Sequence, residues 1–175
     1  TDAAVLIIAG PTQPIEQREK DAITQFLKNG KSAFSLIDTY TFNSQTLTAT
    51  ANQNSFADFV KQYGVSISTN VAYDLRSNET IRMGQGSLSV LRPYPFWIRA
   101  LPVKSQSTIV NRLNNVTIPW TATVNFDDAE IVKQGAKAEK LLATSAFANV
   151  QTENITLNPN TAVFQKDNLQ EQYLA

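Results

Sequence analysis

Carboxylate, serine and lysine side chains are the main groups left to do chemistry in this chain, because its 175 residues include no histidine and no cysteine. Histidine is the commonest general base and metal ligand, and cysteine supplies thiolate nucleophiles, disulfides and zinc sites. What remains is paired carboxylates, Ser–Lys dyads and oxygen-ligated cations. We therefore expect a protein that is not an enzyme and has no cofactor and no metal site. A hydrolase using carboxylates or a Ser–Lys pair is kept as an alternative.

Polar and aromatic residues follow several predicted strands, at the end where open α/β sheets bind ligands. The candidates for lining such a crevice are Thr12, Gln13, Asp38, Tyr40, Tyr73 and Asp74. The competing interpretation, which we favour, is that they are ordinary loop residues, with Asp38 capping a turn. The turn GPTQP at 10–14 is a poor phosphate cradle, because its two prolines lack N–H groups.

The segment RPYPFWIRALP at 92–102 concentrates aromatic rings, prolines and arginines. Tyr94 and Trp97 could anchor a protein or ligand at a binding edge, where such residues are favoured. They could equally pack into the core, because aromatic rings dominate cores and interfaces alike. The first interpretation supports a second alternative function, a soluble carbohydrate- or peptide-binding module.

A short acidic run, Asp127-Asp128-Ala129-Glu130, could help to hold a hard cation with its oxygen atoms. It lacks the glycine and the spacing of a calcium-binding loop, so a solvated turn is the favoured interpretation.

Charge is balanced, with 15 basic and 15 acidic residues, so nothing indicates nucleic-acid binding. The longest apolar run, at 3–9, falls short of the roughly 20 residues that a membrane helix needs. We expect one domain over residues 1–175, with 151–175 as a peripheral tail. We also expect this domain to be cut from a longer protein.

The periodicity predicts a strand at 3–9, an amphipathic helix over 15–30 and a strand at 32–38, which together form a right-handed βαβ unit. Residues 39–54 are polar and favour a loop, and a helix is predicted over 56–63 with Ser55 and Asp58 as its capping box. Beyond it the pattern indicates strands at 71–74, 87–91, 95–101 and 120–126.

Five segments in order carry a resemblance to a known family: VLIIAGPTQPIEQREKDAITQFLKNGKSAFSLID (5–38), FADFVKQYGVSI (56–67), YPFWI (94–98), LNNVTIPWTATVNF (113–126) and LLATSAFANV (141–150). With these segments the chain resembles the extracytoplasmic domain of auxiliary proteins of the ABC-type uncharacterised transport systems, which include gliding-motility components.

The resemblance implies a flavodoxin-like or class I glutamine-amidotransferase-like α/β fold, a parallel sheet flanked by helices, here with an irregular β-rich middle. It implies a bacterial, periplasmic domain anchored to the inner membrane through other segments, with ABC permease and ATPase subunits as partners. Whether the domain also binds a small molecule or a glycan is left open. Amidotransferases use a Cys–His–Glu triad, and the family has no established catalytic residues to carry over to this chain.

Overall fold

The computed structural model describes residues 2–85, 88–103 and 107–175. Its N-terminal part is the predicted βαβ unit: β1 (Val5–Ala9), α1 (Gln17–Lys28) and β2 (Ser32–Leu36), with β1 and β2 parallel. The helix α1 begins with a reciprocal capping box between Glu16 and Glu19. It ends before Gly30, whose φ of 74° suits a residue without a side chain.

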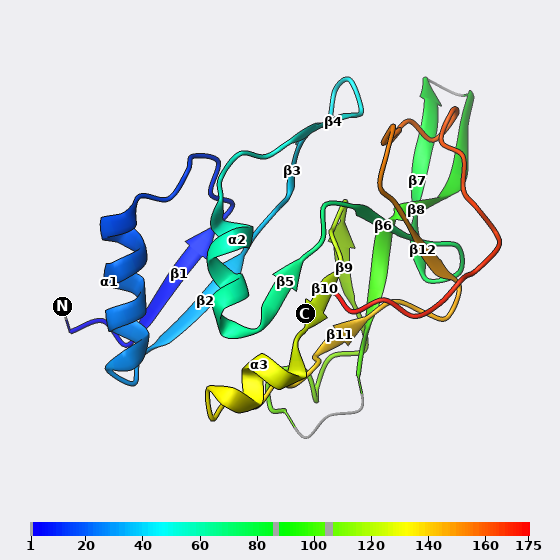
Figure 1. Cartoon of the computed structure of the whole chain (residues 1–175). Coiled ribbons are helices and arrows are strands. Elements are labelled where there is room, and N and C mark those ends of the chain that lie inside the picture. The colour runs from blue at the N-terminus through cyan, green and yellow to red at the C-terminus, as the bar shows by residue number, and fades with distance from the viewer. Residues whose placement is uncertain (1, 86–87, 104–106) are drawn as a thin grey trace.

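The remaining elements are short and mostly strands: β3 (Tyr40–Asn43), β4 (Thr48–Ala51), α2 (Phe56–Val60), the 3₁₀ helix η1 (Lys61–Tyr63), β5 (Val65–Ile67), β6 (Val71–Asp74), β7 (Asn78–Gln85), β8 (Leu88–Pro102), β9 (Val116–Pro119), β10 (Val124–Phe126), α3 (Asp128–Lys133), β11 (Leu142–Ala143) and β12 (Ala148–Gln151). Figure 1 shows the β1–α1–β2 unit at one end of the molecule and the β7–β8 hairpin at the other.

The expected flavodoxin-like or amidotransferase-like parallel sheet between helices is wrong. Strands occupy 37% of the structure and helices 16%, and the strands after β2 pair in small antiparallel sheets. These pairs are β3–β4, β5–β10, β6–β12, and β8 with β7, β9 and β11. Parallel strands need a crossover of a dozen or more residues, usually through a helix. The helices α2 and α3 have only five and six residues, so they are too short to supply one.

The predicted loop at 39–54 is instead the β3–β4 hairpin. Its turn is held by Asn43, whose Oδ1 accepts hydrogen bonds from the N–H groups of Gln45 and Thr46 at 2.9 and 3.0 Å. The threonines in this segment made it look polar, but they are β-branched and suit an exposed strand.

Two other strand boundaries differ from the prediction. β8 runs unbroken through residues 92–95. Pro93 stays in register opposite Thr80, and Pro95 falls in the irregular stretch where the β7–β8 register shifts between Asn78 and Glu79. The strand expected at 120–126 is limited to Val124–Phe126, because Trp120 adopts a φ of 52° that ends β9.

The core lies around β6 and β8. All four residues of β6 are buried, and in β8 alternate residues face inward. These inward residues are Tyr94, Phe96, Ile98 and Ala100. The segment after β12 completes this core, because Leu157 is fully enclosed and Leu174 is 8% exposed.

Candidate functional site

The segments that leave β1 and β2 meet at the carboxyl ends of these strands. The side-chain amide of Asn52 donates to the carbonyl oxygens of Pro11 and Asp38 at 3.1 and 3.2 Å. Asn54 donates to the same Asp38 oxygen at 3.0 Å. The two asparagines therefore tie these segments together at the edge where an open α/β sheet would hold its ligand.

Asn52 joins the backbone of Pro11 to that of Asp38, and Thr12 and Gln13 follow Pro11 in the chain. Thr12, Gln13 and Asp38 are all exposed. The surroundings of the Asp38 carboxyl partly desolvate it and raise its pKa above the ordinary range, although the residue as a whole remains accessible to solvent. Tyr40 lies apart, at the start of β3, where its ring packs 6.3 Å from that of Phe42.

Tyr73 and Asp74 are in the core rather than in a crevice. The Tyr73 hydroxyl donates to the carbonyl oxygen of Gln165 at 3.0 Å. Asp74 is fully buried, and its oxygens accept hydrogen bonds from the N–H groups of Arg76, Ser77 and Ser145 and from the Ser145 hydroxyl. These bonds tie the bend after β6 and the segment at Ser145 to the carboxylate, so Asp74 has the contacts of a structural residue.

Tyr94 and Trp97 belong to the same aromatic core cluster as Tyr73. The buried Tyr94 hydroxyl donates to Leu157 O at 2.6 Å and accepts from Trp120 Nε1 at 3.1 Å. Burial raises the pKa of Tyr94, so the hydroxyl stays a protonated donor. Trp97 is half-buried, and its ring lies edge-on to those of Tyr94 and Trp120.

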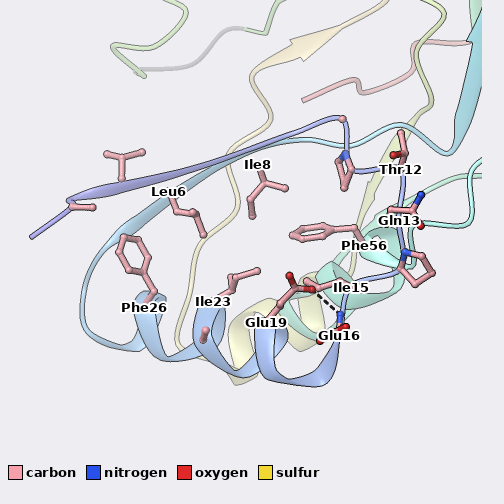
Figure 2. A pocket seen from close by; sticks show the side chains of 16 residues that line it. Leu6, Ile8, Thr12, Gln13, Ile15, Glu16, Glu19, Ile23, Phe26 and Phe56 are labelled. Atoms are coloured by element: carbon pink, nitrogen blue, oxygen red, sulfur yellow. Dashed lines mark hydrogen bonds between the residues drawn. The ribbon is translucent and has the colours of Figure 1, made fainter. Parts of the chain in front are cut away.

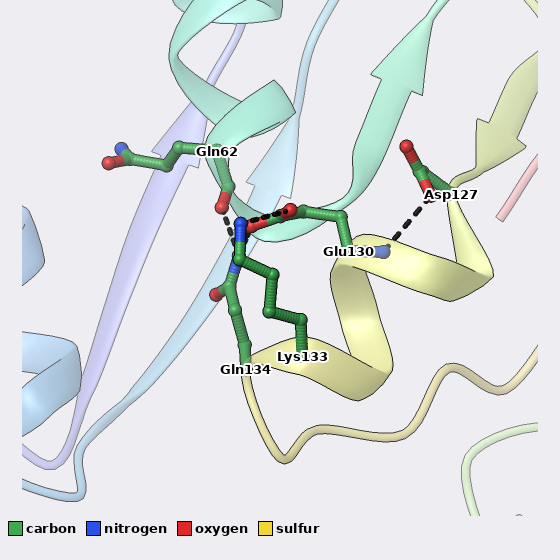
Figure 3. A network of polar contacts seen from close by, with 5 residues as sticks. All are labelled: Gln62, Asp127, Glu130, Lys133 and Gln134. Carbon is green, nitrogen blue, oxygen red and sulfur yellow. Dashed lines mark hydrogen bonds and ion pairs between the residues drawn. The ribbon is translucent and has the colours of Figure 1, made fainter.

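The acidic run at 127–130 begins the helix α3 instead of forming the expected solvated turn (Figure 3). Asp127 caps the helix by accepting from the N–H of Glu130 at 3.0 Å. Glu130 pairs with Lys133 at 3.0 Å and accepts from Gln134, which also donates to the Gln62 carbonyl. Hydrogen bonds from Lys133 and Gln134 lower the pKa of Glu130. In the described part of the chain, no group of acidic side chains is arranged to hold a metal ion.

An apolar groove with a volume of about 990 Å³ lies between β1 and α1 (Figure 2). Its apolar lining includes Leu6, Ile8, Ile15, Ile23, Phe26 and Phe56. Thr12 and Gln13 stand at one end of it, and among the described residues that line it only Glu16 and Glu19 are charged. A groove of this size and polarity is suited to apolar side chains.

The opposite face of the β1–β2 sheet is also apolar and is open to solvent. We call it the bare face: Val5 and Ile7 from β1 are 53% and 66% exposed, and Phe34 and Leu36 from β2 are 56% and 51% exposed. The register pairs Val5 with Ser32 and Ile7 with Phe34, so these side chains share one side of the sheet. The helix α1 lies on the other side, toward which Leu6 and Ile8 point (Figure 2).

Sequence reasoning missed the groove and the bare face, although one signal was present. The run at 3–9 is apolar on both of its faces, which indicates a strand covered on both sides. In the structure, α1 covers one side of this strand and the other side is open. The apolar residues of the run that do not face α1 therefore mark the exposed surface.

These features define a β-rich protein with an apolar groove beside β1 and an exposed apolar face on the β1–β2 sheet. The family described as ABC-type uncharacterized transport system matches residues 1–175, and the chain belongs to this family. No curated protein and no solved structure matches the chain significantly. None of the described helices is long and apolar enough to cross a membrane.

Proposed function

We propose that this chain is a non-catalytic, extracytoplasmic domain of an auxiliary protein in an ABC transport system, and that it works by contacting the permease, which in turn binds the ATPase. Membership of the family supports a role in such a system. The periplasmic location and the membrane anchor in other segments are part of the proposal.

The observation that carries the proposal is the bare face. A parallel sheet normally has both faces covered. Four large apolar side chains, each more than half exposed, gather on one side of β1 and β2. Covering a side chain of this kind stabilises a complex by about 1 kcal/mol for the exposed half alone. A contiguous apolar patch therefore favours a protein partner over a soluble ligand.

The test is photo-crosslinking in the native cell. A photoreactive residue replaces Phe34 on the bare face, and a matched control replaces Val163, which is 77% exposed but lies outside this face. We expect the Phe34 position to crosslink to the permease subunit, identified by mass spectrometry, and the Val163 position not to. Equal labelling from both positions, or none from Phe34, would contradict the proposal.

The alternative of a carbohydrate- or peptide-binding module has weaker support. It requires Tyr94 and Trp97 to line an accessible pocket, whereas Tyr94 is 2% exposed and its hydroxyl is used within the core. The alternative of a carboxylate hydrolase requires Asp38 or Asp74 to meet another acid or a lysine. Neither residue forms such a pair in the described structure.

A further inference from the structure

The outer edge of β1 carries backbone groups without a strand partner. Ser32 N donates to Ala4 O at 3.1 Å, and Gly10 N donates to Leu36 O at 2.9 Å. In a parallel ladder, the backbone N–H and C=O groups of every second residue point toward the partner strand. Because Ala4 and Gly10 bond to β2, the N–H and C=O groups of Val5, Ile7 and Ala9 point away from it. No strand in the described residues pairs with that side of β1. An edge of this kind is a template for another strand.

The apolar groove runs directly along this edge. Its lining comes from β1, the following loop, α1 and Phe56, and includes no residue of β2. The groove therefore opens on the outer side of β1, as Figure 2 shows with Leu6 and Ile8 above Ile23 and Phe26. Side chains of a strand alternate between its two faces. Every second side chain of a strand added to β1 would consequently enter the groove.

The charge of the groove favours a basic residue beside the apolar side chains of an added strand. Glu16 and Glu19 lie at the start of α1, below the carboxyl end of β1, and none of the described residues that line the groove is basic. The Glu19 carboxylate is held in position because it accepts from the Glu16 N–H at 2.9 Å. A lysine or arginine at the matching end of an added strand would meet two fixed negative charges.

We propose that the β1 edge binds an extended segment of a partner protein as an added β-strand, with alternate apolar side chains in the groove and a basic residue beside Glu16 and Glu19. This inference rests on the proposed function and specifies the chemistry of the partner segment. Backbone hydrogen bonds to Val5, Ile7 and Ala9 give affinity, and the groove and the two glutamates give sequence preference.

The first experiment uses synthetic seven-residue peptides that alternate valine and threonine and end in lysine at one terminus or the other. The matched controls carry glutamate in place of lysine. By titration calorimetry with the purified chain, we expect one lysine peptide to bind with a Kd below about 1 mM and its glutamate control at least about tenfold more weakly. The double variant Glu16→Gln, Glu19→Gln keeps the capping acceptors and should remove this preference.

The second experiment blocks the edge itself. Ile7→Pro removes an N–H that points away from β2, and Ser35→Pro is its matched control on the outer side of β2. Ile7→Thr changes the side chain and keeps the N–H. We expect Ile7→Pro to weaken peptide binding at least about tenfold, whereas Ser35→Pro and Ile7→Thr leave it within about twofold.

Methylating alternate backbone amides of the peptide repeats this test without altering the protein. We expect methylation of the amides that point toward β1 to abolish binding. Methylation of the alternate amides, which point away from β1, should be tolerated.

Three results would overturn the inference: no peptide binding, equal loss of binding in Ile7→Pro and Ser35→Pro, or a discrete homodimer that Ile7→Pro dissolves, which would assign the edge to a second copy. The crosslinks expected from Phe34 do not depend on any of these results, so failure of the strand-addition mode and failure of the proposed function are distinguishable.

Discussion

Asp74 shows how one buried carboxylate can hold several segments in place. Its Oδ1 accepts from Arg76 N and Ser77 N at 2.8 Å each, and its Oδ2 accepts from Ser145 N at 2.6 Å. The acid thereby joins the end of β6 to the segment that precedes β12, about seventy residues later in the chain.

We predict that Asp74→Asn lowers the free energy of unfolding by about 2–3 kcal/mol, because its amide nitrogen would face the Ser145 N–H donor and leave it unsatisfied. Ser145→Ala removes only the hydroxyl bond at 2.8 Å and should cost about 1 kcal/mol. Urea denaturation of the three proteins measures the difference. An asparagine variant as stable as the wild type would show that Ser145 N finds another acceptor.

Asp38 is expected to make stability depend on pH in the opposite sense to a paired acid. Burial raises its folded-state pKa, so the folded protein binds this proton more tightly than the unfolded chain does. The ionised carboxylate consequently destabilises the fold above the folded-state pKa, and this effect disappears below the unfolded-state pKa.

Asp38→Asn should therefore raise the free energy of unfolding at pH 7 by a few tenths of a kcal/mol, about the scale of exposed charges, and leave it unchanged near pH 3. Thermal melts across this range provide the measurement. A loss of stability at pH 7 would mean that the carboxylate has a favourable partner in solution.

At the scale of elements, the contact between η1 and α3 depends on one glycine. Gly64 ends η1 with a φ of 75°, and a Cβ built on it would lie 2.5 Å from Ile131 Cγ1 and 3.1 Å from Asp127 O. The Gly64 carbonyl also accepts from Asp127 N at 2.8 Å, so the two backbones cannot move apart freely.

Gly64→Ala should lower the free energy of unfolding by about 2–4 kcal/mol, because the added methyl group clashes with the Ile131 side chain and the Asp127 backbone. Alanine also disfavours the left-handed conformation at this position. Gly30→Ala is the matched control: its φ is 74°, but a Cβ added there would have nothing within 4 Å, so only the conformational cost of about 1 kcal/mol applies. Chemical denaturation compares them. Equal costs would show that α3 can shift away.

At the scale of the whole molecule, packing is uneven. No residue from Val5 to Leu36 is buried, whereas β6 and alternate residues of β8 are enclosed. Local stability follows the density of buried apolar contacts. The βαβ unit is therefore the part of the chain that gains most from an external partner, which agrees with an exposed bare face and an open β1 edge.

Hydrogen exchange should resolve this difference. We predict that amides of β1, α1 and β2 exchange through local opening with lower protection than those of β6 and β8. Phe26→Ala should accelerate exchange only in the βαβ unit, whereas Phe96→Ala should cost about 3–5 kcal/mol and affect the whole domain. Uniform protection across the chain would contradict this division.

The sequence by itself determined the local elements that short-range periodicity and capping specify. The apolar run at 3–9, the amphipathic pattern of 15–30 and the glycines at 30 and 64 place β1, α1 and the end of η1 close to where the structure has them. The missing histidine and cysteine limited the available chemistry before any fold was known.

Only the tertiary structure decided how the strands pair and which side chains remain accessible. Strand pairing depends on partners far away in the chain. The βαβ pattern at the N-terminus therefore could not reveal that later strands such as β6 and β12 pair antiparallel. For the same reason, Tyr73, Asp74 and Tyr94 could not be recognised as core residues from their neighbours in sequence. Periodicity encodes which face of a strand is apolar, but only the assembled fold determines whether that face, as in β1, is covered.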